Sequence, residues 1–572
     1  MTPVSDADLE RALRARLGPT ASFRPCQLES IRAALDGRDC LAVLPTGAGK
    51  SLAYMLPAAA RADAGVPGVI VVVSPLLSLI RDQIRRCDEF DVEAESWTSA
   101  TEPARLRAVE RDLRLSAEDG GPSTALLFTT PESLLAPRLR DALAECARNG
   151  HVAGLAVDEA HCASQWGHDF RPSYLRVRDF RDDVAPLAPT QALTATATRR
   201  AERDIVDALG LRDPRIVRSS LNRPNLKYEV FRREAMEVRD REGDERGAEV
   251  AAVAHVSSLA RACRGDGVGI VYARTRDECD RAADLLADAG LDVASFHAGK
   301  APDHLARTQR EWSEGHLDAV VATIAFGMGV DRPDVRWVAH WGPPATLEGY
   351  YQESGRAGRD GAPARCVLYA GWDELEALRR VGGGAEAAIE YALGDAECRR
   401  KTLLAHFGEK REETCAVGEE SCDVCGDPAR VRRAAKLAER AAERAAERAA
   451  ERAAERAADD ARAAAETRAE ARTKNEAEDR DAIIAGVAAS VGVAVSVATR
   501  VIVTRGPRAM PGPQRARMLS GGGGASAPFR TPFRHAQPAG VTTTAARFGA
   551  PSGGAKRKFV PPTRLGDDRT KR

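Results

Sequence analysis

Short apolar runs that end in polar loops alternate with amphipathic stretches through the first part of the chain. Five such runs lie between residues 20 and 215: CLAVLPTG, VIVVVSP, ALLFTTP, LAVDEAH and TQALTATAT. Short runs rich in Val, Leu and Ile predict buried strands, and stretches such as LLSLIRDQIRRC between them predict helices. Strands that alternate with helices form a parallel sheet covered by helices. The pattern therefore predicts an α/β domain.

A second series of apolar runs begins near Asn225 and continues to about residue 393. It consists of GIVYART, DVASFHAG, AVVATI, VRWVAHWG and ARCVLYA, and it predicts a second parallel sheet covered by helices. The 572 residues leave room for roughly two to four domains. The charged segment 232–250 has no apolar run, and we expect it to form an exposed insertion.

The composition changes after Cys425. From Ala438 to Ala457 the chain repeats Ala-Glu-Arg-Ala, and these are strong helix formers. A period of four drifts against the 3.6 residues of a helical turn, so no fixed apolar face results. We therefore predict a solvated single helix rather than a coiled coil. From residue 505 onward Gly, Pro, Ser, Thr and Ala dominate, with recurring Lys and Arg, which predicts a disordered basic tail.

One stretch, AIIAGVAASVGVAVSVA at 482–498, is a candidate for a membrane span. It is short for the roughly 20 residues that a span needs, so we expect a buried helix, a strand pair or a poorly ordered segment. The start of the chain lacks the apolar core of a secretory signal. In a chain without such a signal, the 12 cysteines are expected to be reduced, with any regular cluster binding metal. The 84 basic and 84 acidic residues balance, and this sum can hide local patches.

The loop LPTGAGKS at 44–51 follows a predicted strand and precedes a predicted helix. Backbone N–H groups in such a glycine-rich loop, together with a helix N-terminus, can hold phosphates. Lys50 would reach the β- and γ-phosphates, and Ser51 would bind Mg²⁺. Leu44 stands where the strict pattern has glycine, and a plain glycine-rich turn is the alternative. The residues that we expect at the nucleotide are Thr46, Gly47, Gly49, Lys50 and Ser51.

Two acidic residues follow the strand of LAVDEAH. Asp158 would hold the Mg²⁺ shell, and Glu159 would orient or deprotonate the attacking water. A surface acidic pair at a strand end is the alternative reading. That alternative is less consistent with a phosphate-type loop about a hundred residues upstream in the same α/β pattern.

The segment YYQESGRAGRDG at 350–361 carries Gln352, Arg356 and Arg359. The two arginines are three residues apart and share one face if the turn is helical. Guanidinium groups there could stabilise the charge of a transferring phosphoryl group. A basic helix face that contacts solvent or DNA phosphate is the alternative.

The segment QWGHDFRP at 165–172 gathers Trp166, His168, Phe170 and Arg171 close to Glu159. Aromatic faces stack on unpaired bases without reading their sequence, at about 1–3 kcal/mol per base. Arg171 could pair with a phosphate or stack as a cation. A packed aromatic turn in the core is the alternative.

The four last cysteines of the chain lie close together in sequence. CDVC forms a thiolate pair, and four soft ligands suit tetrahedral Zn²⁺. Reduced structural thiols are the alternative. The predicted zinc ligands are Cys398, Cys415, Cys422 and Cys425.

Taken together, these motifs resemble the RecQ family of DNA helicases in superfamily 2, over roughly residues 20–426. FRPCQLESI at 23–31 resembles the adenine-reading motif, which implies that Gln27 contacts adenine and Arg24 lies beside it. SPLLSLIRDQ and TTPE resemble DNA-backbone motifs, and ALTATAT resembles the motif that couples hydrolysis to domain movement. VVATIAFGMGVDRPDVR at 320–336 implies that Asp331 touches the nucleotide. YYQESGRAGRDG resembles the arginine-finger motif.

Two further segments carry the resemblance to this family. DEAHCASQWGHDFRPSY resembles the aromatic-rich loop that distinguishes RecQ proteins from other DEAH-box proteins. CRRKTLLAHFGE at 398–409 resembles the RecQ zinc subdomain, although the gap between Cys415 and Cys422 is longer than is usual there. No winged-helix pattern is recognised after Cys425.

The resemblance implies an ATP- and Mg²⁺-dependent DNA helicase with 3′-to-5′ polarity that acts in repair or recombination. The fold expected is two tandem RecA-like parallel-sheet domains followed by a small zinc-binding subdomain. A DNA-stimulated translocase that remodels protein–DNA complexes is the main alternative, and a non-enzymatic DNA-binding scaffold or an RNA helicase is less consistent with the motifs.

The same reading divides the chain into segments and suggests where it acts. Partners would be single-stranded and duplex DNA, with proteins bound by the basic tail and no membrane contact. Localisation would be nuclear in a eukaryote and otherwise in the cytoplasm or at the nucleoid, and the protein would not be secreted. The expected boundaries are 1–19 for the N-terminal segment, 20–218 and 219–394 for the RecA-like domains, 395–430 for the zinc subdomain, 431–480 for the charged helix, 481–504 for the apolar segment and 505–572 for the tail.

Overall fold

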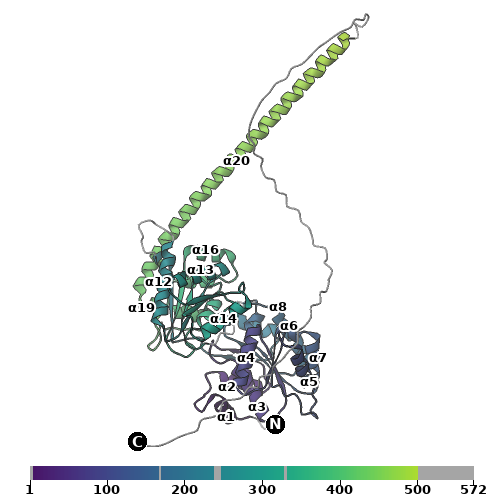
Figure 1. Ribbon diagram of the computed structural model, residues 1–572, viewed down its shortest axis with the longest axis vertical. Coiled ribbons are helices and arrows are strands. Elements are labelled where there is room, and N and C mark those ends of the chain that lie inside the picture. The colour runs from purple at the N-terminus through teal and green to yellow at the C-terminus, as the bar shows by residue number, and fades with distance from the viewer. Residues whose placement is uncertain (1–3, 166–168, 237–245, 328–331, 500–572) are drawn as a thin grey trace, which may run out of the picture. The chain divides into compact units, whose positions relative to one another are not determined.

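The computed structural model describes residues 4–165, 169–236, 246–327 and 332–499 of the chain. Contacts divide the chain into two units, Met1–Glu466 and Thr467–Arg572. The first unit holds both predicted sheets, and its elements are coloured from purple to green in Figure 1.

The first sheet has seven parallel strands in the order β3-β4-β2-β5-β6-β1-β7. The five predicted strands are confirmed as β1, β2, β4, β5 and β6. The prediction missed β3 and β7, because these edge strands are only partly buried and carry polar or charged side chains. The strands are β1 Cys40–Val43, β2 Val69–Val73, β3 Ala94–Trp97, β4 Leu126–Thr129, β5 Val152–Val157, β6 Thr190–Thr194 and β7 Arg215–Arg218.

Helices cover both faces of this sheet. Alternate strand residues pack into two different cores, one with α1 to α4 and the other with α5, α7, α9 and α10. Burial on both faces explains why the strands are continuous apolar runs. The helices are α1 Asp6–Leu17, α2 Gln27–Leu35, α3 Leu52–Asp63, α4 Leu77–Glu89, α5 Pro103–Leu113, α6 Pro131–Leu134, α7 Pro137–Arg148, η1 Ala160–Ala163, α8 Pro172–Leu175, α9 Val177–Val184 and α10 Arg199–Ala208.

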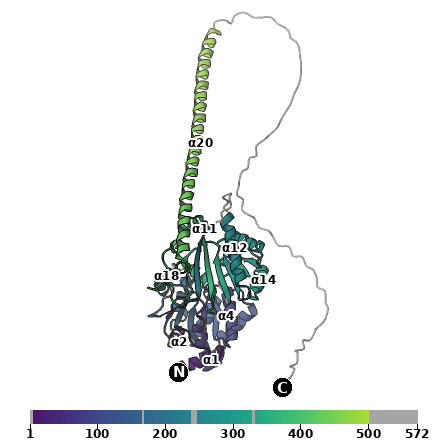
Figure 2. The ribbon, with the colours of Figure 1, turned by 90° about the vertical axis from the view of Figure 1, so that its left-hand side faces the viewer.

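The second sheet has six parallel strands in the order β10-β11-β9-β12-β13-β8. The five predicted strands are confirmed, and β8 was missed because its apolar residues alternate with charged ones in LKYEVFR. α12 and α13 cover one face, and α14, α15 and α17 cover the other. Figure 2 labels α12 and α14 beside this sheet. The strands are β8 Leu226–Arg232, β9 Val268–Tyr272, β10 Val293–Phe296, β11 Ala319–Ala322, β12 Val335–His340 and β13 Ala364–Ala370.

The charged segment 232–250 is not simply an exposed insertion. Its ends belong to α11 and to the first turn of α12, and Arg232 is buried because it ends β8. Residues 237–245 lie outside the described residues. The helices are α11 Arg233–Met236, α12 Arg246–Ala262, α13 Arg276–Asp288, α14 Pro302–Ser313, α15 Leu347–Ser354, α16 Trp372–Val381 and α17 Glu386–Leu393.

The cysteine segment and a long helix follow the second sheet. They comprise α18 Arg399–His406, α19 Asp423–Gly426 and α20 Pro428–Thr499. The Ala-Glu-Arg repeat lies within α20, as predicted (Figure 1). The prediction of a fully solvated helix is wrong for its start, because Val431, Ala438 and Ala442 are buried at helical spacing.

The apolar stretch that begins at residue 482 continues α20. Its large side chains Ile483, Ile484 and Val487 are exposed, so the prediction of a buried helix or strand pair is wrong. Among the described residues, α20 and the other helices are each too short or too polar to form a membrane span. The tail from residue 500 lies outside the described residues.

Strand order decides where the predicted motifs meet. β6 lies between β1 and β5 in the first sheet, so the loops that follow these three strands share one edge. That edge, at the carboxyl ends of parallel strands, is where α/β sheets bind ligands.

Candidate functional site

The phosphate-type loop connects β1 to α3 at the carboxyl edge of the first sheet. Gly47 and Gly49 adopt φ of 78° and 76°, a left-handed conformation that favours glycine. Leu44, which departs from the strict pattern, is 1 % exposed and packs in the core, so this position has a structural role. The loop leads into the N-terminus of α3, an arrangement suited to anions.

Arg24 and Gln27 contact this loop from the start of α2. Gln27 Nε2 donates to the carbonyls of Ala48 at 2.7 Å and Gly49 at 3.3 Å. Its Oε1 accepts from the backbone N–H of Arg24 at 2.8 Å, and the Arg24 guanidinium bonds the Gly47 carbonyl. The structure thus brings both predicted adenine-site residues to the phosphate loop.

The acidic pair lies at the end of β5. Burial raises the pKa of the Asp158 carboxyl to about 7; the Glu159 carboxylate adds to the rise and Lys50 opposes it. An uncompensated carboxyl of this kind favours a bound cation, because a cation restores the ionised form. Glu159 has φ of 47°, a conformation that costs about 1–3 kcal/mol in a residue other than glycine. Such strain is often found at functional sites.

His161 connects the acidic pair to the loop after β6. Its Nδ1 lies 3.4 Å from Glu159 Oε2 and 3.1 Å from the Thr194 hydroxyl. Thr194 in turn donates to the carbonyl of Thr196 at 3.2 Å. The His161 side chain therefore lies between the predicted coupling motif ALTATAT and Glu159 of the acidic pair.

A turn from the second sheet reaches the phosphate loop. The Thr46 hydroxyl donates to the carbonyl of Gly355 at 3.1 Å, across a separation of 309 residues. A Cβ atom at Gly355 would lie 2.4 Å from Thr46 Oγ1, so this approach requires glycine. A Cβ atom at Gly47 would lie 3.7 Å from Cγ of Arg359. The structure therefore brings the half-buried Arg359 to the phosphate loop.

The other residues of this motif lie in or next to α15. Arg356 is 5 % exposed, and a Cβ atom at Gly327 would lie 3.0 Å from its guanidinium. Gln352 is half-buried in α15. Asp331, predicted at the nucleotide, lies outside the described residues.

The aromatic-rich segment is described only in part. Trp166 and His168 lie outside the described residues, whereas Phe170 and Arg171 are half-buried. Arg171 pairs with Asp169 at 2.9 Å and donates to the Pro75 carbonyl at 2.8 Å. In this structure its guanidinium is therefore hydrogen-bonded to protein groups.

Two residues that were not predicted attach this segment to its surroundings. The buried Tyr174 donates its hydroxyl to the Asp158 carbonyl at 3.1 Å. Asp204 on α10 accepts from the Ser164 hydroxyl at 2.6 Å and from the Gln165 N–H at 3.0 Å. Tyr174 ends the segment DEAHCASQWGHDFRPSY, but neither of these two roles was predicted, because each partner is distant in sequence.

The four predicted zinc ligands gather into one cluster. Their sulfur atoms all lie within 4.8 Å of one another. Cys398 Sγ is 3.6 Å from Cys415 Sγ and 3.8 Å from Cys422 Sγ. Zn–S bonds of about 2.3 Å place tetrahedral thiolates roughly 3.8 Å apart. The cluster therefore fits Zn²⁺, including Cys415 at the end of the longer gap.

We expect the purified protein to hold about one zinc ion per chain and Cys425→Ser to lose most of it, because a site with three thiolates binds zinc less tightly. Metal analysis by mass spectrometry measures this content. Cys263→Ser, at a half-buried cysteine outside the cluster, is the matched control. Full zinc occupancy in Cys425→Ser would contradict the assignment.

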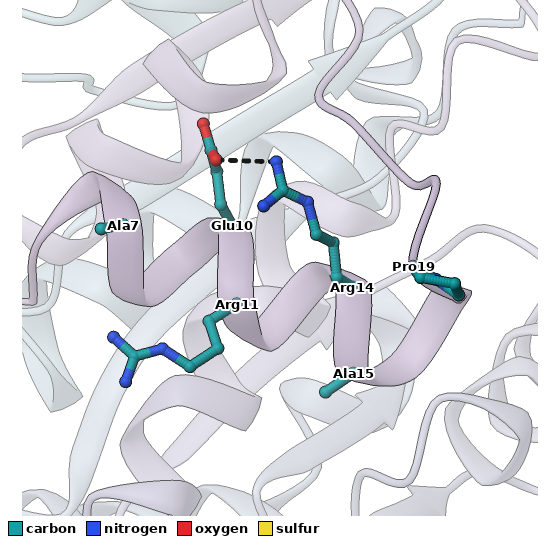
Figure 3. Close-up of a pocket in the computed structure, with 6 residues that line it drawn as sticks. All are labelled: Ala7, Glu10, Arg11, Arg14, Ala15 and Pro19. Atoms are coloured by element: carbon teal, nitrogen blue, oxygen red, sulfur yellow. Dashed lines mark hydrogen bonds and ion pairs between the residues drawn. The ribbon is translucent and has the colours of Figure 1, made fainter.

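A surface pocket lies along α1, just before the motif that carries Arg24 and Gln27. It is lined by Ala7, Glu10, Arg11, Arg14, Ala15 and Pro19 (Figure 3). Glu10 and Arg14 form an ion pair at 2.9 Å. None of the predicted site residues lines this pocket, so its shape adds nothing to the candidate site.

Three family descriptions match the chain in order. The family described as DEAD/DEAH box helicase matches residues 24–205. The family described as helicase conserved C-terminal domain matches residues 254–361, and the one described as RecQ zinc-binding matches residues 377–426.

Curated relatives resemble the same region. The Caenorhabditis elegans RecQ-like DNA helicase blm-1 is 37 % identical over 447 residues, 75 % of this chain and 43 % of the relative. The Xenopus laevis RecQ-like DNA helicase BLM is 38 % identical over 423 residues, 70 % of this chain and 29 % of the relative. The chain thus spans less than half the length of these two relatives.

A solved structure, Mycobacterium smegmatis helicase Lhr bound to ssDNA and AMP-PNP, matches with a TM-score of 0.52 at 21 % identity, over 67 % of this chain and 49 % of that one. At this identity the match supports the fold of the two sheet domains. The three family matches and the relatives carry the identification further, and they show that the chain belongs to the RecQ family of superfamily 2 helicases.

Proposed function

We propose that the protein is an ATP- and Mg²⁺-dependent DNA helicase that translocates 3′ to 5′ on single-stranded DNA and separates duplexes during repair or recombination. The observation that carries the proposal is the contact of the Gly355 turn with the phosphate loop. It brings a turn of the second sheet domain to the phosphate loop of the first. The names of the relatives, which are DNA helicases, support DNA as the substrate.

The first sheet supplies the groups that would bind ATP and Mg²⁺ and activate the attacking water. Backbone N–H groups of the loop and the Lys50 ammonium would bind the phosphates of ATP. Ser51 and Asp158 offer the oxygen ligands that Mg²⁺ prefers, and the ion would neutralise phosphate charge. Glu159 would accept a proton from the attacking water, and His161 would hold its carboxylate in place.

The second sheet supplies positive charge for the transition state. Arg359 lies at the phosphate loop, and Arg356 lies three residues earlier in the same turn. Guanidinium groups stabilise charge on a transferring phosphoryl group, and they do so only while the two sheets are in contact. Hydrolysis would weaken that contact, and repeated closing and opening would advance the protein along one strand.

The aromatic-rich segment would make hydrolysis depend on bound DNA. Phe170 and Trp166 would stack on unpaired bases. The Tyr174 hydroxyl and the Asp204 carboxylate connect the segment to Asp158 and to α10. A base contact would thus shift groups that contact the acidic pair.

We expect Phe170→Ala to keep ATP binding and basal turnover but to lose most DNA stimulation, because stacking worth about 1–3 kcal/mol per base corresponds to roughly a 5- to 150-fold loss. ATP turnover measured against the concentration of single-stranded DNA tests this. Trp166→Ala, in the same aromatic-rich segment, serves as the second variant. Normal stimulation of ATP turnover by DNA in both variants would show that the segment has only a packing role.

The decisive experiment is strand displacement on a duplex with a 3′ single-stranded tail, run beside ATP turnover. Displacement that requires ATP, Mg²⁺ and the 3′ tail supports the proposal. Turnover without displacement would favour the alternative, a translocase that remodels protein–DNA complexes. A 5′-tailed duplex is the control for polarity.

The tail beyond residue 504 is rich in Lys and Arg, and we propose that it adds DNA affinity by releasing counterions. Binding through this tail would weaken steeply as salt rises. A protein that acts on DNA is expected in the nucleus of a eukaryote or at the nucleoid of a prokaryote.

A further inference from the structure

The segment that joins the two sheets has an unusual set of partners. Residues 219–225, here called the linker, run from the end of β7 to the start of β8. Both halves of the linker are hydrogen-bonded to the segment that carries the four cysteines.

Glu409 contacts the first half of the linker. Its Oε1 accepts from the Ser220 hydroxyl at 2.6 Å, and its Oε2 accepts from the Leu221 N–H at 2.8 Å. Just before the linker, Arg218 donates to the Phe407 carbonyl at 2.9 Å. Hydrogen bonds to a charged acceptor are stronger than neutral ones.

Arg400 contacts the second half. It is 1 % exposed and donates to the carbonyls of Arg223 at 2.6 Å and Leu226 at 2.9 Å, and to Asn222 Oδ1 at 2.9 Å. A buried guanidinium is costly unless its N–H groups are satisfied. The Arg223 carbonyl and the Asn222 side chain of the linker, and the first residue of β8, therefore have to stay close to Arg400.

The loop between Cys415 and Cys422 completes these contacts. Glu419 accepts from Asn222 Nδ2 at 2.7 Å, and the Glu420 N–H donates to the Pro224 carbonyl at 2.8 Å. The loop that makes this gap long therefore contacts the linker directly. The residues between the two cysteines carry the side-chain and backbone groups that bind the linker, and the cysteines lie at the ends of the loop.

The opposite side of the linker contacts the arginine turn. Arg223 donates to the carbonyls of Gly355 at 3.0 Å and Ala357 at 2.8 Å. The Tyr351 hydroxyl donates to the Leu221 carbonyl at 2.8 Å. Gly355 is also the residue that accepts from Thr46 of the phosphate loop. A shift of the linker would therefore move the turn that carries Arg356 and Arg359.

We propose that Arg400, Glu409 and Glu419, here called the linker clamp, are positioning residues for ATP turnover. They hold the linker against the cysteine segment, and the linker then holds the arginine turn in register with the phosphate loop. This inference rests on the proposed function for its kinetic consequence. In this proposal the zinc site does more than stabilise its own segment, because the segment also couples the two sheets through the linker.

Glu409 offers the sharpest test because it is half-buried and lies outside the cysteine cluster. Glu409→Ala removes both hydrogen bonds to the linker. Glu409→Gln keeps them, because its amide can donate to the Ser220 hydroxyl while its oxygen accepts from the Leu221 N–H. Glu412→Ala, at an exposed acid of the same segment, is the matched control.

We expect Glu409→Ala to lower kcat of the DNA-stimulated ATP turnover about tenfold while KM for ATP stays within about twofold, because transition-state groups are misplaced and ground-state binding is not. Zinc content should be unchanged in all three variants. Glu409→Gln and Glu412→Ala should retain near-normal kcat. Equal kcat in Glu409→Ala and Glu412→Ala would overturn the proposal, as would an equal loss in Glu409→Gln.

A second measurement does not depend on activity. Fluorescent labels introduced through non-natural amino acids at the exposed positions Glu118 and Asp303 report the distance between the sheets in single full-length molecules. Glu409→Ala should broaden the distance distribution, and Glu409→Gln should not. An unchanged distribution in Glu409→Ala would contradict the clamp. If the wild type lacks ATP turnover, the proposed function fails, and the distance distributions still decide whether the clamp exists.

Discussion

Lys50→Ala is expected to lower ATP turnover by a factor of about 10²–10³, the loss typical when one preorganised electrostatic group is removed from a reacting centre. Lys50 lies in the loop between β1 and α3, where its ammonium would bind the β- and γ-phosphates. Steady-state ATP hydrolysis with saturating single-stranded DNA measures the effect. Strand displacement should fall with it, because the two activities share one energy source.

Lys436→Ala, at an exposed lysine of α20, is the matched control for this substitution. DNA binding without nucleotide should persist in Lys50→Ala, since the aromatic-rich segment and the basic tail are unchanged. ATP turnover that survives Lys50→Ala would show that hydrolysis occurs elsewhere, and the proposed site would be wrong.

Arg359→Ala is expected to reduce turnover even more, by roughly 10³-fold, which is the lower end of the effect of an arginine finger. The reason is positional: Arg359 comes from the second sheet domain and lies beside Gly47 in the phosphate loop of the first. Its charge is therefore available only when the two sheets are in contact. ATP binding, measured with a fluorescent analogue, should change little, because in the proposed site the loop would supply most of the phosphate contacts.

Arg359→Lys separates charge from geometry, since a lysine keeps the charge but lacks the planar fork of donors. We expect it to recover only a small part of the activity. Arg379→Ala, at an exposed arginine of α16 in the same domain, is the control. A turnover within about twofold of wild type in Arg359→Ala would exclude the finger role.

Much of the fold was predictable because buried parallel strands have a distinctive sequence. β1, β2 and β11 have both faces covered by helices, so each is a continuous apolar run. β3 and β7 were missed because edge strands need apolar residues at fewer positions. Burial at the start of the stretch 482–498 was wrongly predicted for the opposite reason, since apolar composition alone does not show whether another element covers a helix.

The candidate site also contains residues that local sequence predicts and residues that it does not. Glycines in the phosphate loop, the acidic pair after β5 and the cysteine pattern are local features, and each was readable because its chemistry demands particular residue types at a short spacing. Tyr174 and Asp204 were not readable, because a hydroxyl or carboxylate acquires such a role only through its partner in space.

The sequence alone determined the two α/β series, the order of the motifs and the four candidate zinc ligands, because these depend on local periodicity and on ligand chemistry. Only the tertiary structure decided that the Gly355 turn contacts Thr46 and that Arg400, Glu409 and Glu419 bind the linker. The physical reason is that hydrogen bonds between segments up to 309 residues apart depend on how the chain packs. A single polar residue has no periodic pattern that would reveal its distant partner.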